Sequence, residues 1–199
     1  KNHDLKTIEL FGKSDEQMLV MIEQLTLYVN EFILHPNQQN ANDIKKIYFL
    51  LFKNNFFIDL HENNHDDSLN MKDFLILSMY LFQALNRDNY LNTSEKQTFL
   101  SEIQKRFDKI KPAHKWGFTM SKCKIGRDQW SCQNHTYSHQ LTRTLYGATF
   151  GSSKDYAMGE KMYKFAIDDL KPDGALWREA VRGRWSWSYY AHTLGLLLS

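Results

Sequence analysis

The stretch Ser14–Ile33 reads SDEQMLVMIEQLTLYVNEFI, and its pattern indicates the fold class of the whole chain. Apolar residues recur every three or four positions, which is the period of an amphipathic helix. They are Met18, Leu19, Met21, Ile22, Leu25, Tyr28, Val29, Phe32 and Ile33. A hydroxyl residue at Ser14 followed by Gln17 is typical of a capping box. His35 should end this helix, because the residue before a proline avoids the helical conformation.

Helical periodicity continues on the C-terminal side of this stretch. Further helices are predicted from a cap at Asn42 or Asp43, over Met71–Leu85, from a cap at Thr93 or Ser94 to Pro112, and over Gln133–Phe150, Lys154–Leu170 and Trp185–Leu198. No long stretch alternates cleanly between apolar and polar residues, as a strand would. Helices joined by short connections pack as antiparallel hairpins. The sequence therefore predicts an all-α fold.

Length and composition limit the kind of protein. The chain has 199 residues, of which 42% are hydrophobic, so one domain spanning 1–199 can bury a core. The net charge of +2 is too small for long-range attraction of polyanions, so we expect no nucleic-acid partner. No apolar run reaches the ~20 residues of a membrane helix, so we expect no membrane partner. We also expect a monomer.

The two ends suggest a longer natural protein. Lys1–Leu10 does not have the pattern of a signal peptide, so we expect that any targeting segment has been removed. Ser199 follows an apolar run with no cap behind it. We therefore expect truncation at one or both ends.

Two short segments could hold a metal ion or a disulfide. His61–Asp67, HENNHDD, lacks the regular spacing that gives metal ligands a fixed geometry, so we interpret it as a solvated loop that caps the next helix. Cys123 and Cys132 flank the segment KIGRDQWS, and a disulfide between them would close a small loop just before Asn134. Two free buried thiols are the alternative, and two cysteines do not identify the compartment.

The last third of the chain concentrates cationic and aromatic side chains after an Asn-His pair. The pair is Asn134-His135, and the later residues are Trp177, Arg178, Arg182, Arg184, Trp185, Trp187, Tyr189 and Tyr190. Guanidinium groups bind carboxylates, and flat rings suit sugar faces. This composition therefore suits an acidic sugar.

Two pairs within this region could perform acid–base chemistry. Asn134 offers an amide donor, and His135 can exchange a proton near neutral pH. Arg182 and Tyr189 are seven residues apart, so they would share one face if this stretch is helical. A guanidinium beside a phenol lowers the phenol pKa from ~10. The alternatives are an Asn cap with an incidental His, and a basic surface patch beside an aromatic core.

In their order along the chain, these residues resemble the mannuronate-type alginate lyases (polysaccharide lyase family 5 and its relatives). The matching residues are Asn134–Tyr137, Pro172–Leu176, Glu179, Arg182-Gly183 and Tyr189. The resemblance covers roughly residues 75 to 199. It implies an (α/α) toroid, or an incomplete barrel of antiparallel helical hairpins, that cleaves a uronate-containing polysaccharide by β-elimination without a metal or organic cofactor.

The resemblance also implies a role for each matched residue. Asn134 and Arg182 would hold the uronate carboxylate. His135 would assist its neutralisation or act as the base, and Tyr189 would be the base, the acid or both. Further contacts with an acidic polysaccharide would come from Tyr137, Arg178, Arg184, Trp185 and Tyr190. The protein would then be periplasmic or secreted.

Five positions depart from the family motif. Gln133, Ser138 and Tyr190 replace its Asn, Trp and His, and Arg184 and Trp185 occupy its Gln/Arg positions after the RG pair. These departures leave open whether the polymer is alginate or a related capsule or exopolysaccharide. The alternative to a lyase is a non-catalytic module on the same scaffold that binds or exports an acidic polysaccharide.

Overall fold

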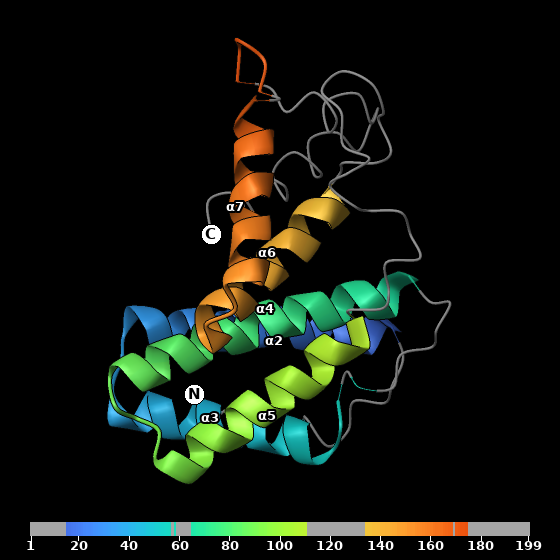
Figure 1. Ribbon diagram of the computed structural model, residues 1–199. Helices are drawn as coiled ribbons and strands as arrows, with labels where there is room; N and C mark the ends of the chain where they lie inside the picture. The colour runs from blue at the N-terminus through green and yellow to red at the C-terminus, as the bar shows by residue number, and fades with distance from the viewer. Residues whose placement is uncertain (1–14, 57, 59–64, 111–133, 169, 175–199) are drawn as a thin grey trace. The chain divides into compact units, whose positions relative to one another are not determined.

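The computed structural model describes residues 15–56, 58, 65–110, 134–168 and 170–174. These residues form the helices α2 (Asp15–Leu34), α3 (Gln38–Lys53), α4 (His65–Arg87), α5 (Thr93–Ile110), α6 (Asn134–Phe150) and α7 (Ser153–Asp168) (Figure 1). No strand occurs in this part of the chain, which confirms the all-α class. The chain divides into two compact units, Lys1–Lys111 and Pro112–Ser199. A single domain and a toroid remain predictions.

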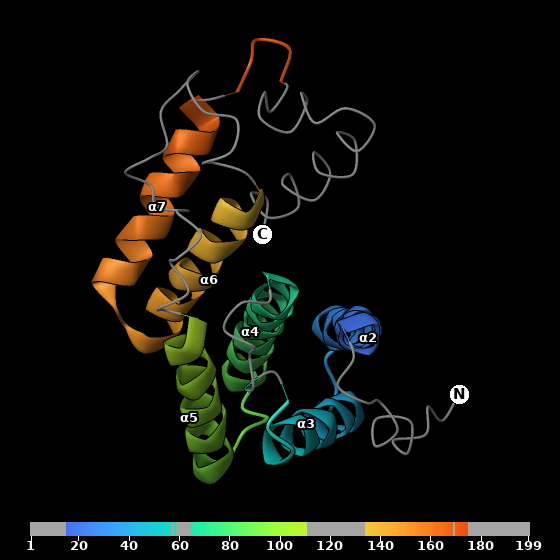
Figure 2. The same ribbon diagram turned by 90° about the vertical axis from the view of Figure 1, so that its right-hand side faces the viewer.

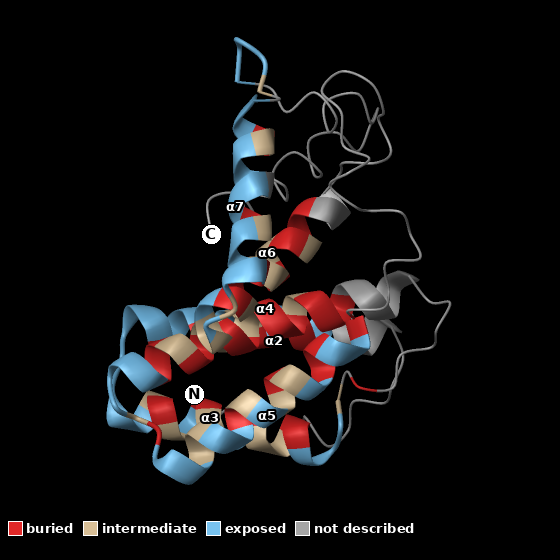
Figure 3. Ribbon diagram, in the orientation of Figure 1, coloured by how far each residue is buried: buried red, intermediate tan, exposed pale blue. Residues whose placement is uncertain are grey.

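The helices of the first unit form two layers, as Figure 2 shows. α2 lies beside α4 in one layer, and α3 and α5 form the other. Each helix runs opposite to the one before it, so α2 and α4 point the same way (Figure 1). This is an arrangement of antiparallel hairpins, as the sequence predicts. Figure 3 shows that buried residues dominate α4, which therefore carries much of the core.

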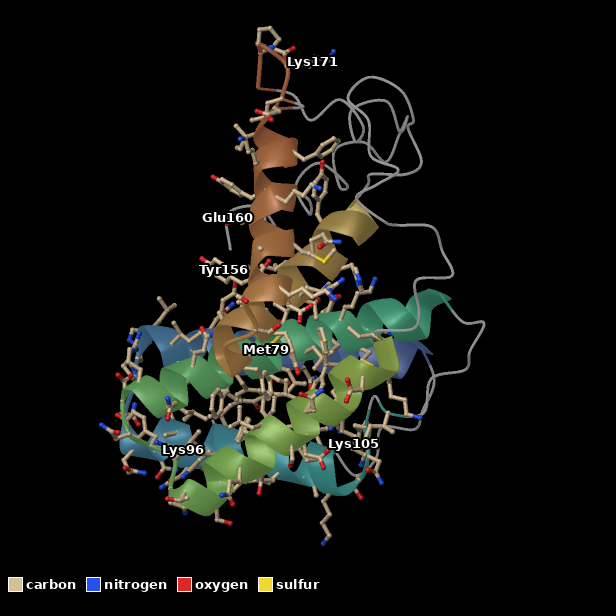
Figure 4. The ribbon with its side chains drawn as sticks, in the orientation of Figure 1. Met79, Lys96, Lys105, Tyr156, Glu160 and Lys171 are labelled. Carbon is tan, nitrogen blue, oxygen red and sulfur yellow. The ribbon has the colours of Figure 1, made fainter. Side chains whose placement is uncertain are left out.

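An aromatic cluster joins α3, α4 and α5. The ring of Tyr48 stacks on Phe74 with centroids 5.6 Å apart and on Phe99 with centroids 5.8 Å apart. Phe52 meets Phe99 edge-on at 5.2 Å. Offset and edge-on pairs of this kind contribute beyond the area they bury. In Figure 4, Met79 of α4 lies among these core side chains, whereas Lys96 and Lys105 extend from the surface of α5.

Two helices begin at caps that differ from the predicted ones. The side chain of Asn37 accepts a hydrogen bond from the Asn40 backbone N–H at 2.9 Å, so α3 begins at Gln38 rather than after Asn42 or Asp43. Asn92, rather than Thr93 or Ser94, caps α5. It exchanges hydrogen bonds of 2.8 and 2.9 Å with Glu95. In both places the side-chain oxygen of asparagine accepts a hydrogen bond from the backbone N–H three residues later, which has no partner within the helix.

The helix α4 begins earlier than predicted. It starts at His65 rather than Met71, so the second half of the predicted loop His61–Asp67 is helical. Asp66 and Asp67 are acidic residue types, which are favoured in the first turn of a helix by its dipole. The rest of that segment, residues 61–64, lies outside the described residues.

The described part of the second unit is the hairpin of α6 and α7. These helices agree with the predicted Gln133–Phe150 and Lys154–Leu170 to within three residues at every end. Gly151 joins them with a φ of 71°, a conformation that other residues adopt at a cost. The predicted turn at Pro172–Gly174 is confirmed, since the Gly174 N–H donates to the Lys171 carbonyl at 2.8 Å. None of the described helices combines the length and apolar character needed to span a bilayer.

Candidate functional site

The predicted Asn-His pair lies at the start of α6. The helix begins at Asn134, so Asn134 and His135 belong to its first turn. The first backbone N–H groups of a helix have no partner within the helix, and the helix dipole makes this end partially positive. A carboxylate is therefore favoured at the end of α6 that carries the pair.

The contact between α6 and α7 is marked by two glycines, Gly147 of α6 and Gly159 of α7. A Cβ at Gly147 would overlap the backbone of Tyr156, and a Cβ at Gly159 would overlap the side chain of Thr144. The two helices therefore approach closely where these residues meet. Positions 134, 138, 142 and 145 share a different face of α6, because they repeat at helical spacing.

An ion pair fixes α6 to the start of α7. The Nε of Arg143 donates to Asp155 at 2.9 Å, and both side chains are largely buried. Ser152 donates to the same carboxylate at 2.7 Å and accepts from the Asp155 backbone N–H. Sequence reasoning missed these residues, although a serine three positions before an aspartate is a recognisable start signal for a helix.

Several polar side chains on α6 are buried. They are Ser138, Gln140 and Thr142. The hydroxyl of Thr142 donates to the Ser138 carbonyl at 2.8 Å, and that of Thr144 donates to the Gln140 carbonyl at 2.8 Å. By contrast, the Oγ of Ser138 and the Oε1 of Gln140 have no hydrogen-bond partner. Buried polar atoms normally have one, so these two atoms are unusual.

The structure describes few of the other predicted site residues. Tyr137, predicted to contact substrate, lies in α6 and is buried. Arg178, Arg182, Arg184, Trp185, Tyr189 and Tyr190 lie outside the described residues, as do Cys123 and Cys132. Their roles and the disulfide remain predictions. Among the residues that are described, no three His, Cys, Asp or Glu side chains gather as metal ligands.

Comparison with known families identifies the wider class of protein. The family model described as alginate lyase matches residues 1–199, which includes the first 74 residues, where the motifs gave no match. A comparison with curated proteins found no match. The family match implies a polysaccharide lyase that cleaves an acidic polysaccharide by β-elimination. Because the match spans the whole sequence, the chain belongs to the alginate lyase family.

Proposed function

We propose that this protein cleaves a uronate-containing polysaccharide by β-elimination, with Asn134, His135, Arg182 and Tyr189 as its catalytic residues. The observation that carries the proposal is the family match over residues 1–199. It is supported by the start of α6 at Asn134, since the positive end of a helix favours the substrate carboxylate there.

The first requirement of the reaction is to make the C5 proton of the uronate acidic. Asn134 and Arg182 donate hydrogen bonds to the C6 carboxylate. They stabilise the negative charge that develops on its oxygens when the proton leaves. His135 adds to this neutralisation or acts as the base for one epimer at C5. The guanidinium of Arg182 is suited to the task because it can bind a carboxylate through two parallel hydrogen bonds.

The second requirement is to move two protons. A base, Tyr189 as phenolate or His135, removes the proton from C5. The electron pair forms the C4–C5 double bond while the bond from C4 to the glycosidic oxygen breaks. Tyr189 then protonates the departing oxygen as the general acid. The products are an unsaturated uronate and a new chain end, and no redox step is needed.

The remaining predicted contacts bear on the identity of the polymer and on the cellular location of the protein. Tyr137, Arg178, Arg184, Trp185 and Tyr190 would hold neighbouring sugars through charge and ring stacking. Gln133, Ser138 and Tyr190 differ from the family motif, so the polymer is alginate or a related acidic capsule or exopolysaccharide. Because such polymers lie outside the cytoplasm, we place the protein in the periplasm or outside the cell.

The test of this function is the ultraviolet absorbance of the unsaturated uronate. We expect the parent protein to produce it from at least one of alginate, polygalacturonate and an aminouronate polymer. The Tyr189→Phe variant should produce none, whereas Tyr163→Phe, at an exposed position of α7, should match the parent. Binding of polymer without any product from the parent would instead support the non-catalytic module.

The role of Arg182 can be measured separately. Arg182→Ala should lower kcat/KM by about 100- to 1000-fold, which is typical for loss of one donor to a developing oxyanion. The control is Arg87→Ala, which removes an exposed arginine paired with Asp88 in the first unit. Parent-like kcat/KM in Arg182→Ala would remove this residue from the mechanism.

A further inference from the structure

The hydroxyl of Ser138 differs from the other hydroxyls near it on α6. Thr142 and Thr144 each donate to the carbonyl four residues earlier, which is the usual way a helix satisfies a buried hydroxyl. Ser138 is 2% exposed, and its Oγ makes no hydrogen bond. An unpaired buried hydroxyl is costly to stability. A group that is kept at such a cost is a candidate for binding a ligand.

The place of Ser138 on the helix points to the predicted substrate site. It follows Asn134 by four residues, so the two positions lie on one face of α6 and about 6 Å apart along the helix axis. That separation is comparable to the width of one sugar ring. A uronate whose carboxylate is held at Asn134 would therefore place a ring hydroxyl near Ser138.

Gln140 has a buried unpaired oxygen as well, but its position favours a different role. It precedes Thr144 by four residues, and Thr144 contacts Gly159 of α7. Gln140 therefore belongs to the side of α6 that meets α7, not to the face that carries Asn134 and Ser138. We assign no ligand to it.

We propose that Ser138 is a specificity-determining residue, whose hydroxyl binds a free ring hydroxyl of the uronate held at the first turn of α6. This inference rests on the proposed function. A serine hydroxyl both donates and accepts, which matches a sugar hydroxyl and does not match a carboxylate. An O-acetylated ring position has lost its donor and is larger, so Ser138 favours the unacetylated polymer. A site that is built to bind a hydroxyl rejects analogues that lack one.

The test compares Ser138→Ala with Thr142→Ala. For Ser138→Ala we expect an unchanged or higher melting temperature, because an unpaired hydroxyl is removed, and a loss of about fivefold in kcat/KM on the unacetylated polymer. Thr142→Ala removes a hydroxyl that is already paired within the helix. It should lower the melting temperature and leave kcat/KM on that polymer unchanged.

Specificity is measured on the same uronate polymer with and without O-acetylation. The parent should prefer the unacetylated form, and Ser138→Ala should lose that preference while Thr142→Ala keeps it. Equal preference in the parent and Ser138→Ala would overturn the role of Ser138. So would a parent-like kcat/KM in Ser138→Ala.

A calorimetric titration with unacetylated uronate oligosaccharide separates this proposal from the proposed function. If the parent binds the oligosaccharide but forms no product, lyase chemistry fails, and weaker binding by Ser138→Ala still supports the contact. Equal binding by the parent and Ser138→Ala overturns the contact. A parent that neither binds nor cleaves overturns both proposals.

Discussion

Arg106 of α5 shows how a single charged residue can belong to a core. Its side chain has 0% exposure and lies over the rings of Phe52 and Phe74, with its Cζ 5.0 and 5.3 Å from their centroids. It donates to the Phe56 carbonyl at 2.8 Å and pairs with Glu102. Burial lowers the pKa of Arg106, and Glu102 opposes that effect. The residue thus joins α5 to the chain that follows α3.

Replacing Arg106 should therefore destabilise the first unit. Arg106→Met leaves the Phe56 carbonyl and the Glu102 carboxylate without their shared donor. We expect a loss of about 3 kcal/mol in the free energy of unfolding, measured by chemical denaturation. The control is Lys109→Met, at an exposed position of the same helix, which should change stability by no more than about 0.5 kcal/mol. Equal effects of the two variants would contradict the structural role of Arg106.

At the scale of helices, the α6–α7 hairpin is held by close packing as well as by the Arg143–Asp155 pair. Gly159→Ala places a methyl group where Thr144 lies. The helices must then separate, and we expect destabilisation of about 2 kcal/mol by thermal or chemical unfolding. Lys161→Ala, at an exposed position of the same helix, should stay within about 0.5 kcal/mol of the parent. Stability of Gly159→Ala equal to that of the parent would show that the helices do not meet there.

A second link between helices depends on pH. The Lys45 ammonium of α3 donates to the Glu95 carboxylate of α5 at 3.0 Å and to the Tyr90 carbonyl at 2.9 Å. Burial acts to raise the pKa of Glu95, but hydrogen bonds from Asn92 and Lys45 outweigh it, so the pKa is lowered. The charged form of Glu95 is therefore the one that the folded state stabilises.

The sign of that shift determines the pH dependence. A carboxylate with a lowered folded pKa stabilises the fold above its unfolded pKa of about 4.3, and this contribution is lost as the pH falls through the folded pKa. Glu95→Gln should thus be less stable than the parent at neutral pH, and the difference should narrow in acid. Gln97→Ala is the control. Its difference from the parent in the free energy of unfolding should not change with pH, because this variant keeps the Glu95 carboxylate. If the difference in the free energy of unfolding between the parent and Glu95→Gln stayed constant into acid, a stabilising role of the Lys45–Glu95 pair would be refuted.

At the scale of the whole molecule, the net charge of +2 gives little long-range attraction for an acidic polymer. Binding should therefore depend on local arginines, whose contacts weaken as salt screens them. We expect the KM for the polymer to rise with ionic strength, and Arg178→Ala and Arg184→Ala to make that rise shallower. The control is Arg87→Ala, which should keep the parent slope. If KM rose equally with ionic strength in the parent and all three variants, the polymer would not bind at Arg178 or Arg184.

The sequence by itself determined the helical class and most helix bounds. The period of the apolar residues in α2 and α5 is local, and it survives in any fold that buries one face of each helix. The apolar period of α6 and α7 is local as well, and the ends of these helices were predicted within three residues. The ordered motifs from Asn134 to Tyr189 also identified the family, which the match over residues 1–199 confirms.

The tertiary structure decided the features that depend on which side chains meet. Asn37 and Asn92 became caps in place of nearby polar residues, because their oxygens reach the first free N–H groups. The burial of Arg106 and the unpaired hydroxyl of Ser138 follow from neighbours that periodicity does not specify. A helical period fixes the face on which a residue lies. What covers that face depends on contacts between segments distant in the chain, such as Arg106 with Phe56.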